Sequence, residues 1–305
     1  MPRILILGIH AADLTFRMER LPALGETVLG RSFAKGPGGK GSNQAVACAR
    51  AGGEAHILTR LGRDAFGEDA LRLWAEAGAT AHAIRGDTPT GAAAILLTAS
   101  GENAICVYPG AGGDLCEADI DAHADLIAGA AILLTQLEQP LPAARRALEI
   151  ARAGGAMTIL NPAPAAPLPD DLLALCDWIT PNETEASALA GLPVTDSASA
   201  ASACAALRAR GAGAVTLTLG ADGAMIDAGS GALHVPAFRA GPVVETTGAG
   251  DAFNGALAAA LAEGRPAPEA ARFACAAAAI SVTRPGAAAA MPLRAEIDAL
   301  LAASA

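Results

Sequence analysis

Short apolar runs alternate with longer segments of helical pattern along most of the 305-residue chain. Apolar runs bounded by turn residues are typical of strands buried on both faces of a parallel sheet. Such strands are predicted at residues 3–9, 55–62, 130–138, 156–163, 177–183 and 214–220, and helices at 42–52, 66–78, 141–154, 197–211, 251–264 and 267–283. This alternation predicts an α/β fold, a doubly wound and mostly parallel sheet that helices cover on both faces.

Two regions break the alternation and carry a period of two residues instead. Residues 11–35 and 88–108 follow a β-hairpin pattern, and the second region has a turn at residues 100–103. Strands outside the strand–helix series indicate a small β-sheet lid on the main sheet. No internal repeat or low-complexity linker divides the chain, so we expect a single α/β domain over residues 1–305.

The amino-acid composition limits which classes of partner the protein can bind and which cellular compartment we expect for it. The formal charge is −10 and the pI is about 4.9, which argues against nucleic acid or an anionic membrane as partner. An anionic ligand would therefore need locally placed cations, a metal ion or helix N-termini. The six cysteines lack CxxC spacing and have apolar neighbours, and the N-terminal apolar run is too short for a signal or membrane segment. We therefore expect a cytoplasmic protein with reduced, buried cysteines.

The segment GPGGKGSNQ, residues 36–44, holds one of only two lysines in the chain; the other is Lys35. It fails the Walker A pattern, because Gly41 follows Lys40 where Ser or Thr is required. Glycines let the backbone approach a ligand, and a helix predicted to begin near Ser42 would point free N–H groups at the same place. Lys40 and Asn43 would add a cation and an amide for hydroxyl groups. A plain glycine-rich turn that caps a helix explains the segment equally well.

The segment VETTGAGDAFNG, residues 244–255, places three small residues before an amphipathic helix. Gly248, Ala249 and Gly250 can form a nest of backbone N–H donors for an anion. Asp251, in the first helical turn, could accept a proton from a hydroxyl that attacks a phosphate held there. An ordinary first-turn aspartate is the alternative interpretation. A dinucleotide fingerprint is not met, since Phe253 stands where Gly or Ala is needed.

Two further motifs follow predicted strands. In TPNETEA, Asn182, Glu183 and Glu185 are suitable for a hydrated Mg²⁺, although helix capping by Asn182 is equally natural. In TLGADG, residues 218–223, the glycines allow close approach to a flat or anionic ligand, and a hairpin turn is the alternative.

Taken together and in order, these motifs resemble the ribokinase group of the PfkB carbohydrate kinases. GGKGSNQAVA and TTGAGDAFNGALAAAL are similar to the two signature regions of that family, and LLTQLEQP, LNPAPA, ITPNETEA, TLGADG and RFACAAAAISVTRPGA also match in order. The resemblance covers nearly the whole chain. It implies an α/β sandwich with a β-sheet lid, homodimers formed through the lid, and ATP-dependent phosphorylation of a sugar's primary hydroxyl. The simplest substrate is a pentose, D-ribose giving ribose 5-phosphate.

The resemblance also assigns roles to residues. Asp251 matches the catalytic base, and Gly248, Ala249 and Gly250 match the anion hole. Sugar-binding positions correspond to Ala11, Asp13, Gly39, Lys40, Gly41, Ser42, Asn43, Glu138 and Asp251. Nucleotide-binding positions correspond to Asn182, Thr218, Leu219, Gly220, Ala221, Asp222, Gly223, Gly250 and Cys275. Asn182 and Glu185 match the pair associated with Mg²⁺. Lys35 has no such match, and we expect a solvated charge in the lid.

Three departures from the ribokinase pattern involve four residues. Ala11 replaces an Asn that contacts the sugar, which opens the alternatives of 2-deoxyribose or another pentose. Gly112 also stands where ribokinases commonly have Asn. In the K⁺ site, Glu245 replaces an Asp and Ala290 replaces a Ser or Asn. The remaining ligands of that site would be backbone carbonyls of Thr247, Ser281, Arg284 and Gly286.

Three other functions stay open on the sequence. These are a nucleoside kinase of the same family, a catalytically silent sugar-binding regulator on this fold, and a dinucleotide-dependent dehydrogenase. The last lacks its glycine fingerprint.

Overall fold

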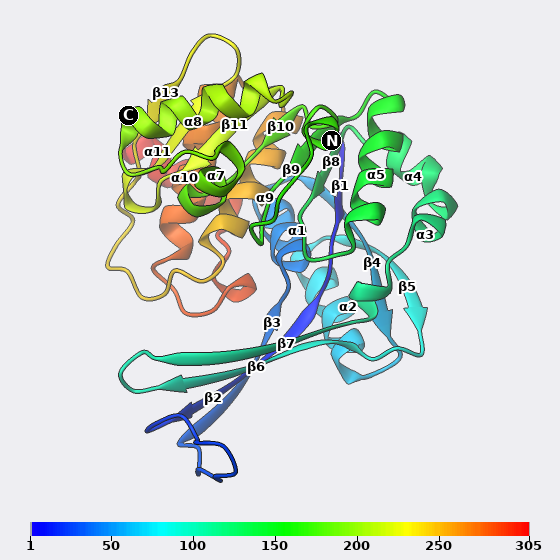
Figure 1. The fold of residues 1–305 in the computed structure, drawn as a ribbon, viewed down its shortest axis with the longest axis vertical. Coiled ribbons are helices and arrows are strands. Elements are labelled where there is room, and N and C mark those ends of the chain that lie inside the picture. Colours follow the sequence, from blue (N-terminus) through cyan, green and yellow to red (C-terminus); the bar gives the residue numbers. More distant parts are fainter. Residues whose placement is uncertain (1, 305) are drawn as a thin grey trace.

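The computed structural model describes residues 2–304 and contains two separate β-sheets (Figure 1). The large sheet has nine strands in the order β13-β12-β11-β10-β9-β8-β1-β4-β5. Its strands are β1 (Arg3–Leu7), β4 (Glu54–Gly62), β5 (Thr80–Gly86), β8 (Ile132–Thr135), β9 (Met157–Leu160), β10 (Trp178–Ile179), β11 (Ala214–Thr218), β12 (Ala224–Asp227) and β13 (Leu233–Val235). All pairings are parallel except β11–β12 and β12–β13. The predicted mostly parallel sheet is therefore confirmed.

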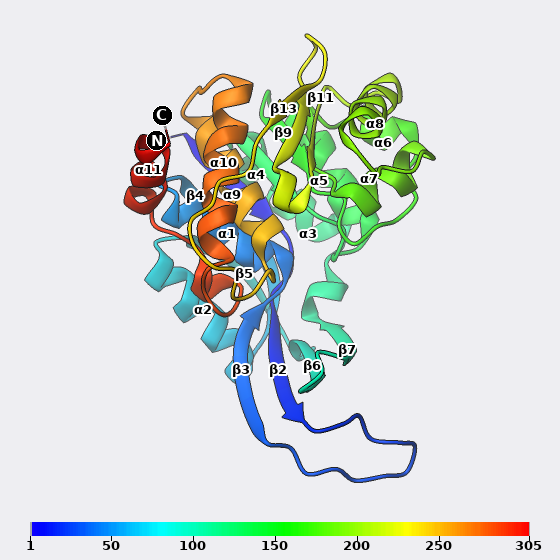
Figure 2. The same ribbon diagram turned by 90° about the vertical axis from the view of Figure 1, so that its left-hand side faces the viewer.

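Helices cover both faces of the large sheet (Figures 1 and 2). The α-helices are α1 (Lys40–Arg50), α2 (Ala65–Ala77), α3 (Glu117–Ala122), α4 (Ala124–Ala128), α5 (Leu141–Ala153), α6 (Asp170–Leu173), α7 (Glu183–Ala190), α8 (Ser197–Ala209), α9 (Ala249–Ala262), α10 (Ala267–Ser281) and α11 (Arg294–Ala303); short 3₁₀ turns lie at Ala111–Asp114, Gly220–Asp222 and Ala288–Ala290. No helix among residues 2–304 is long and apolar enough to cross a membrane.

The central strand β1 shows how the core is divided. Ile4 and Ile6 belong to a cluster with α1, α9 and α10, whereas Leu5 and Leu7 belong to a cluster with α5 and α8. Successive side chains of a strand point to opposite faces, so one apolar run fills both layers. This is why the buried strands read as continuous apolar runs in the sequence.

Some element boundaries differ from the sequence-based prediction. Helix α1 begins at Lys40, two residues before the predicted start at Ser42, because Gly39 is its N-cap with φ 85°. The strand predicted at 177–183 is reduced to Trp178–Ile179, and β5, β13 and α11 were missed. Edge and terminal elements bury less surface, so their apolar pattern is weaker. The hairpin interpretation of residues 218–223 is correct, since β11 and β12 pair antiparallel.

The small sheet has the strand order β3-β2-β6-β7 and extends away from the main body (Figure 2). Its strands are β2 (Ala11–Met18), β3 (Ser32–Gly38), β6 (Thr90–Thr98) and β7 (Asn103–Gly110). They overlap the two regions predicted as hairpin material, but β3 and β7 extend two or three residues beyond the predicted ends at 35 and 108. Residues 19–31 form a long connection rather than part of a strand. Because side chains alternate, Asp13, Ile105 and Val107 share one face of the small sheet. Phe16 and Phe33 share the other face.

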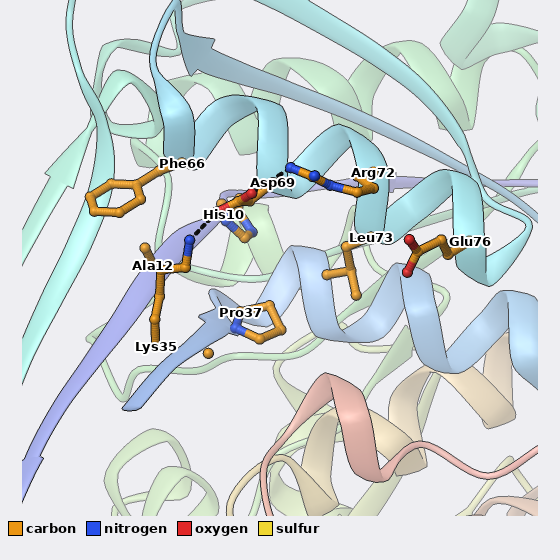
Figure 3. A pocket seen from close by; sticks show the side chains of 10 residues that line it. His10, Ala12, Lys35, Pro37, Phe66, Asp69, Arg72, Leu73 and Glu76 are labelled. Carbon is orange, nitrogen blue, oxygen red and sulfur yellow. Dashed lines mark hydrogen bonds and ion pairs between the residues drawn. The ribbon is translucent and has the colours of Figure 1, made fainter. Parts of the chain in front are cut away.

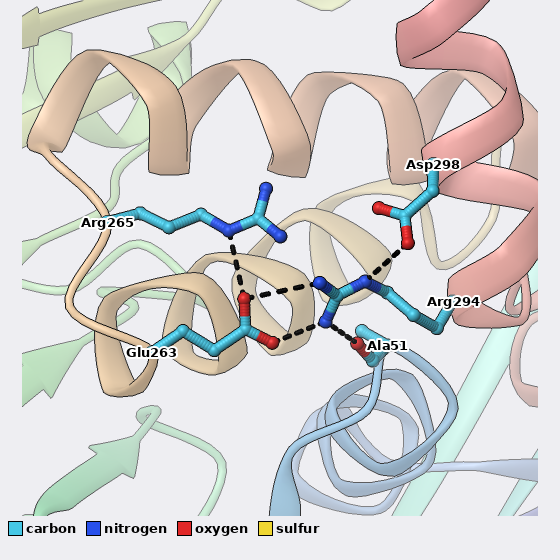
Figure 4. Close-up of polar contacts among 5 residues, drawn as sticks. All are labelled: Ala51, Glu263, Arg265, Arg294 and Asp298. Atoms are coloured by element: carbon cyan, nitrogen blue, oxygen red, sulfur yellow. Dashed lines mark hydrogen bonds and ion pairs between the residues drawn. The ribbon is translucent and has the colours of Figure 1, made fainter.

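The C-terminal helix α11 is attached to α9 and α1 through one arginine (Figure 4). Arg294 donates to both carboxylate oxygens of Glu263, to Asp298 at 2.8 Å and to the carbonyl of Ala51 at 3.4 Å. Arg265 donates to the same Glu263 carboxylate at 2.9 Å. Planar guanidinium groups suit such multiple acceptors, and the cluster holds three helices together.

Candidate active site

A cavity of about 100 Å³ lies where α1 and α9 begin, beside the carboxyl ends of β9, β10 and β11. Ligands of open α/β sheets bind at such carboxyl ends. The cavity is lined by Lys40, Asn161, Ala163, Thr180, Asn182, Glu185, Thr218, Gly248, Gly250, Asp251 and Asn254. The structure therefore brings together residues from all four sequence motifs, which are spread over more than 200 residues of the chain.

Asp251 is buried in the first turn of α9, with 6% of its surface exposed. Asn43 Nδ2 donates to Asp251 Oδ2 at 3.0 Å, and Gln44 Nε2 donates to Oδ1 at 3.0 Å. Burial raises the pKa of the Asp251 carboxyl, while Lys40 and the two amide donors oppose that shift. Asp251 is thus a buried carboxylate with a raised proton affinity at the edge of a cavity, as a general base requires.

The N-terminus of α9 presents backbone donors beside Asp251. Gly248 is its N-cap, with φ 80°. Within the described chain, the N–H groups of Gly250 and Asp251 have no hydrogen-bond partner, whereas that of Ala249 donates to the carbonyl of Thr246. Free N–H groups and the positive end of the helix dipole favour an anion here. Of the three predicted nest residues, Ala249 has its N–H already engaged.

The N-terminus of α1 is held against Glu138. The backbone N–H of Lys40 donates to Glu138 Oε2 at 2.7 Å. Gly41 packs against the backbone of Gly8, since a Cβ at position 41 would lie 2.6 Å from the Gly8 Cα. Only glycine allows this approach of α1 to the end of β1. Glycine in this segment thus allows α1 to pack closely against β1, in addition to leaving space for a ligand.

Carboxylic acids surround this end of α1. Burial raises the pKa of Asp13 to about 6. Burial also raises the pKa of Glu138, and the nearby carboxylates of Asp251 and Asp13 raise it further. The backbone N–H and the charge of Lys40 lower the pKa of Glu138. Asp13 and Asp251 are therefore both within electrostatic reach of Glu138, and Lys40 is the cation that acts on Glu138 and Asp251. Such a group suits a ligand with several hydroxyls, because carboxylates accept their hydrogen bonds.

The neighbouring positions of the glycine-rich segment differ in what they offer. Asn43 is 5% exposed, and its Oδ1 is a buried acceptor without a partner in the described structure. Ser42 is fully buried, and its hydroxyl bonds to His10 Nδ1 at 3.1 Å and to Trp74 Nε1 at 3.0 Å. Its side chain therefore supports the fold and is not brought to the cavity. Ala11 is buried on β2, on the same face of the small sheet as Asp13.

Asn182 and Glu185 form a reciprocal capping box at the start of α7. Asn182 Oδ1 accepts from the Glu185 N–H at 2.8 Å, and Glu185 Oε2 accepts from the Asn182 N–H at 2.9 Å. The capping interpretation is confirmed. Both residues also line the cavity, where Glu185 Oε1 stays available to a hydrated Mg²⁺. Burial raises the pKa of Glu185, and a bound dication would favour its ionised form.

The predicted nucleotide-binding positions are only partly assembled around this cavity. Thr218 lines it and forms a bridge with Asn182. Gly220, Ala221 and Asp222 are exposed on the turn after β11, and Leu219 and Gly223 are buried there. Cys275 is 5% exposed within α10, in the core cluster shared with α1 and α9. Burial raises the pKa of its thiol to about 12.

The residues of the predicted K⁺ site come from two segments: Glu245 and Thr247 precede α9, whereas Ser281 ends α10 and Arg284, Gly286 and Ala290 follow in the next loop. Glu245 Oε2 accepts from the N–H of Gly286 at 2.9 Å, so Glu245 and the loop are adjacent. Ala290 is buried and supplies no side-chain oxygen. Arg50 Nη1 donates to three carbonyls of this loop, those of Ala288, Ala289 and Met291. No group of three His, Cys, Asp or Glu side chains suited to a metal exists within residues 2–304.

A larger cavity of about 230 Å³ lies between α2 and the small sheet (Figure 3). Lys35 and Arg72 both pair with Asp69 at its edge. Lys35 also lies 5.9 Å from the centre of the Phe66 ring. Lys35 is exposed on β3 of the lid, as expected for a solvated charge, but it also pairs with Asp69 of α2. None of the residues around Asp251 lines this cavity, and we place the reacting groups in the smaller one.

Five residues of the site were missed by the sequence analysis: Gln44, Asn161, Ala163, Thr180 and Asn254. Asn254 Nδ2 donates to the Gly250 carbonyl at 2.8 Å, and Asn254 Oδ1 accepts from the Thr180 hydroxyl. A compositional signal could have found two of them. The chain has five asparagines, and Asn43, Asn161, Asn182 and Asn254 contact Asp251 or line the cavity.

Comparison with known proteins agrees with this geometry. A family model described as pfkB family carbohydrate kinase matches residues 1–294. The chain belongs to the pfkB family of carbohydrate kinases, and it is an ATP-dependent sugar kinase. It is 39% identical over 293 residues to a ribokinase of Haemophilus influenzae, covering 95% of both chains. It is also 34% identical over 258 residues to a deoxyribokinase of Salmonella typhi, covering 84% of both chains.

Solved structures extend the similarity to the fold. A ribokinase of Arabidopsis thaliana, solved with ribose and ATP, superposes with a TM-score of 0.93 at 32% identity, covering 98% of both chains. A ribokinase of Thermotoga maritima superposes with a TM-score of 0.90 at 34% identity, covering 99% of this chain and 100% of the other. The family resemblance inferred from the motifs is confirmed.

Proposed function

We propose that the protein transfers the γ-phosphoryl group of ATP to the primary hydroxyl of a pentose, most simply D-ribose, giving ribose 5-phosphate. The observation that carries this proposal is the position of Asp251. It is a buried carboxylate with raised proton affinity, adjacent to free N–H groups at the start of α9 and bonded to Asn43 of α1. The ribokinases and the ribose and ATP complex among its relatives support the choice of substrate.

The mechanism follows from what each group can do. Asp13 and Glu138 accept hydrogen bonds from the sugar hydroxyls and orient them, and Asn43 holds Asp251 in place beside them. Asp251 accepts the proton of the attacking hydroxyl. The N–H groups of Gly250 and Asp251 stabilise charge on the transferred phosphoryl group. The small sheet, with Asp13 on its inner face, excludes water as a lid over the sugar.

Two ions are part of the proposal. A hydrated Mg²⁺ associated with Asn182 and Glu185 would neutralise phosphate charge. K⁺ would bind near Glu245 and the carbonyls of Thr247, Ser281, Arg284 and Gly286. The side chain of Ala290 adds no ligand to this set. We therefore expect only a modest activation by K⁺.

The decisive experiment measures ADP release by the purified protein with Mg²⁺ and ATP. The acceptors are D-ribose, 2-deoxy-D-ribose, other pentoses, hexoses and nucleosides, each with and without K⁺. Fast turnover on D-ribose supports the proposal. Faster turnover on 2-deoxyribose would reassign the substrate, in line with the deoxyribokinase relative. Absence of ADP release with every acceptor would contradict a sugar kinase.

Ala11→Asn is expected to raise kcat/KM for D-ribose about fivefold to tenfold, mainly through a lower KM. The amide adds one hydrogen bond to a sugar hydroxyl, worth about 1 kcal/mol. Steady-state kinetics with D-ribose and 2-deoxyribose measure the change. Ala12→Asn is the control, because Ala12 is equally buried but on the opposite face of β2. An unchanged KM in a variant with native melting temperature would show that residue 11 does not face the sugar.

The outer face of the small sheet is proposed to bind a second copy of the chain. Phe16 and Phe33 lie there with ring centres 5.1 Å apart, 37% and 58% exposed, and Tyr108 shares that face with 49% exposure. Exposed apolar clusters of this kind are typical of interaction sites. Phe33→Glu is expected to convert a dimer to a monomer in sedimentation velocity. Leu233→Glu, at an exposed apolar site on the large sheet, should leave the dimer intact. A monomeric wild-type protein would refute the assignment.

A further inference from the structure

A series of buried amides connects a backbone carbonyl to Asp251. Asn161 Nδ2 donates to the Thr180 carbonyl at 2.9 Å, and a carbonyl can only accept. Asn161 Oδ1 therefore faces Gln44 and accepts from its Nε2 at 3.1 Å. The same Gln44 Nε2 donates to Asp251 Oδ1 at 3.0 Å, and Gln44 Oε1 accepts from Gln136 Nε2 at 2.6 Å.

These contacts allow the side-chain amide of Gln44 only one orientation. Both of its N–H groups and its carbonyl are engaged, and the residue is fully buried. A flipped Gln44 amide would bring two acceptors together at Asn161 and two again at Asp251, at the cost of buried unpaired groups. Gln44 therefore always presents an N–H to Asp251 Oδ1.

We propose that Gln44 is a positioning residue that keeps Asp251 Oδ1 as a hydrogen-bond acceptor, so that Oδ2 is the oxygen that takes the proton of the sugar hydroxyl. This inference rests on the proposed function of Asp251 as the base. It assigns the proton to one atom, and it assigns to Gln44 a role that the sequence motif does not reveal.

The surroundings of Oδ2 fit this role. Oδ2 accepts only from Asn43 Nδ2, and the other end of that amide, Oδ1, is buried without a partner in the described chain. The Asn43 amide is therefore free of the constraint that fixes Gln44. When Oδ2 gains a proton, Asn43 can turn its Oδ1 to accept it, so both states of the base are hydrogen-bonded. Lys40 favours the Asp251 carboxylate, and the charge of Asp251 in turn raises the pKa of the neighbouring Glu138 and Glu185.

Gln44→Met tests the proposal, because methionine keeps the length of the side chain and removes the donor. A donor to a carboxylate stabilises its ionised form, so its loss raises the pKa of Asp251. A larger fraction of the base is then protonated at neutral pH, and kcat at pH 7 is expected to fall by up to about a hundredfold. The acidic limb of the kcat–pH profile should move up by about one to two units. Activity should recover at high pH, and KM for the sugar should stay within about threefold.

Two further variants separate this role from a structural one. Gln136→Met leaves Gln44 in place but removes its outer partner, and we expect a smaller shift of the acidic limb in the same direction. Gln139→Met removes an equally buried amide that donates to Thr135 and to the Gln136 carbonyl. It should lower the melting temperature without moving the pH profile. An unchanged acidic limb in folded Gln44→Met, or an equal shift in Gln139→Met, would overturn the proposal.

A second readout does not depend on turnover. The ¹³C resonance of the Asp251 side-chain carboxyl, followed against pH in protein labelled at aspartate, reports its pKa directly, with Asp251→Asn to assign the signal. An upward shift in Gln44→Met shows, independently of turnover, that the Gln44 donor acts on Asp251. An identical titration in wild type and Gln44→Met overturns the inference. Normal turnover in Asp251→Asn would refute the proposed function instead, so the two failures are distinguishable.

Discussion

Asp251→Asn is expected to lower kcat by about 10²-fold to 10⁴-fold, the contribution of a positioned general base, while the sugar still binds. The substitution keeps the size of the side chain and its place between Asn43 and Gln44, but removes the group that accepts the proton. The carboxylate is 6% exposed, so water cannot readily replace it as the base. ADP release and calorimetric binding of the sugar measure the two effects. Loss of ADP release with retained sugar binding would show that the variant has lost the phosphoryl-transfer step and not sugar recognition.

A matched control for this variant is Asp196→Asn. Asp196 is also an aspartate at a helix N-terminus, where it caps α8 by accepting from the Ser199 N–H at 2.8 Å. It is exposed and lies outside the cavity, and asparagine caps a helix as well as aspartate does, so Asp196→Asn should leave both the melting temperature and the turnover unchanged. Near-normal kcat in Asp251→Asn would remove Asp251 as the base and leave the carboxylates of Asp13 and Glu138 to be tested in its place.

Gly255→Ala is expected to destabilise the protein by about 1 to 3 kcal/mol and to reduce activity with it. A Cβ at position 255 would lie 2.6 Å from the Ala47 Cβ, the Cys48 nitrogen and the Gln44 carbonyl oxygen. Helix α9 would have to move away from α1, and that movement separates Asp251 from Asn43 and Gln44. Chemical denaturation measures the first effect, and kcat measures the second.

For Gly250→Ala, earlier in the same helix, we expect the opposite effect on stability. A Cβ at position 250 meets no atom within 4 Å, and alanine favours the helix by about 0.5 to 1 kcal/mol. Stability should stay the same or rise. Gly250 lines the cavity where we place the transferred phosphoryl group, so kcat should nevertheless fall. A fully active Gly250→Ala would show that the anion binds elsewhere, and a stable Gly255→Ala would show that α1 and α9 tolerate separation.

Local chemistry and periodicity were sufficient to predict much of this protein. The apolar runs of β1, β4, β8, β9 and β11 are buried on both faces, so each one identified its strand without reference to the rest of the chain. The starts of α1 and α9 could also be predicted from the sequence. Glycines, a following polar residue and an amphipathic helical pattern are all local features of the chain. The family followed from the order of these motifs.

The tertiary structure decided how side chains distant in sequence meet. Gln44, Asn161 and Asp251 are joined by single hydrogen bonds across more than 90 residues, and no local pattern distinguishes those amides from ordinary buried ones. Ser42 and Asn43 are adjacent in the sequence, yet one supports Trp74 and the other contacts Asp251. Lys35 is ion-paired because α2 packs beside β3. The sequence alone thus determined the elements and the chemistry available, since both depend on neighbouring residues. Only packing decided which groups meet, because side-chain directions depend on how whole helices and sheets are placed.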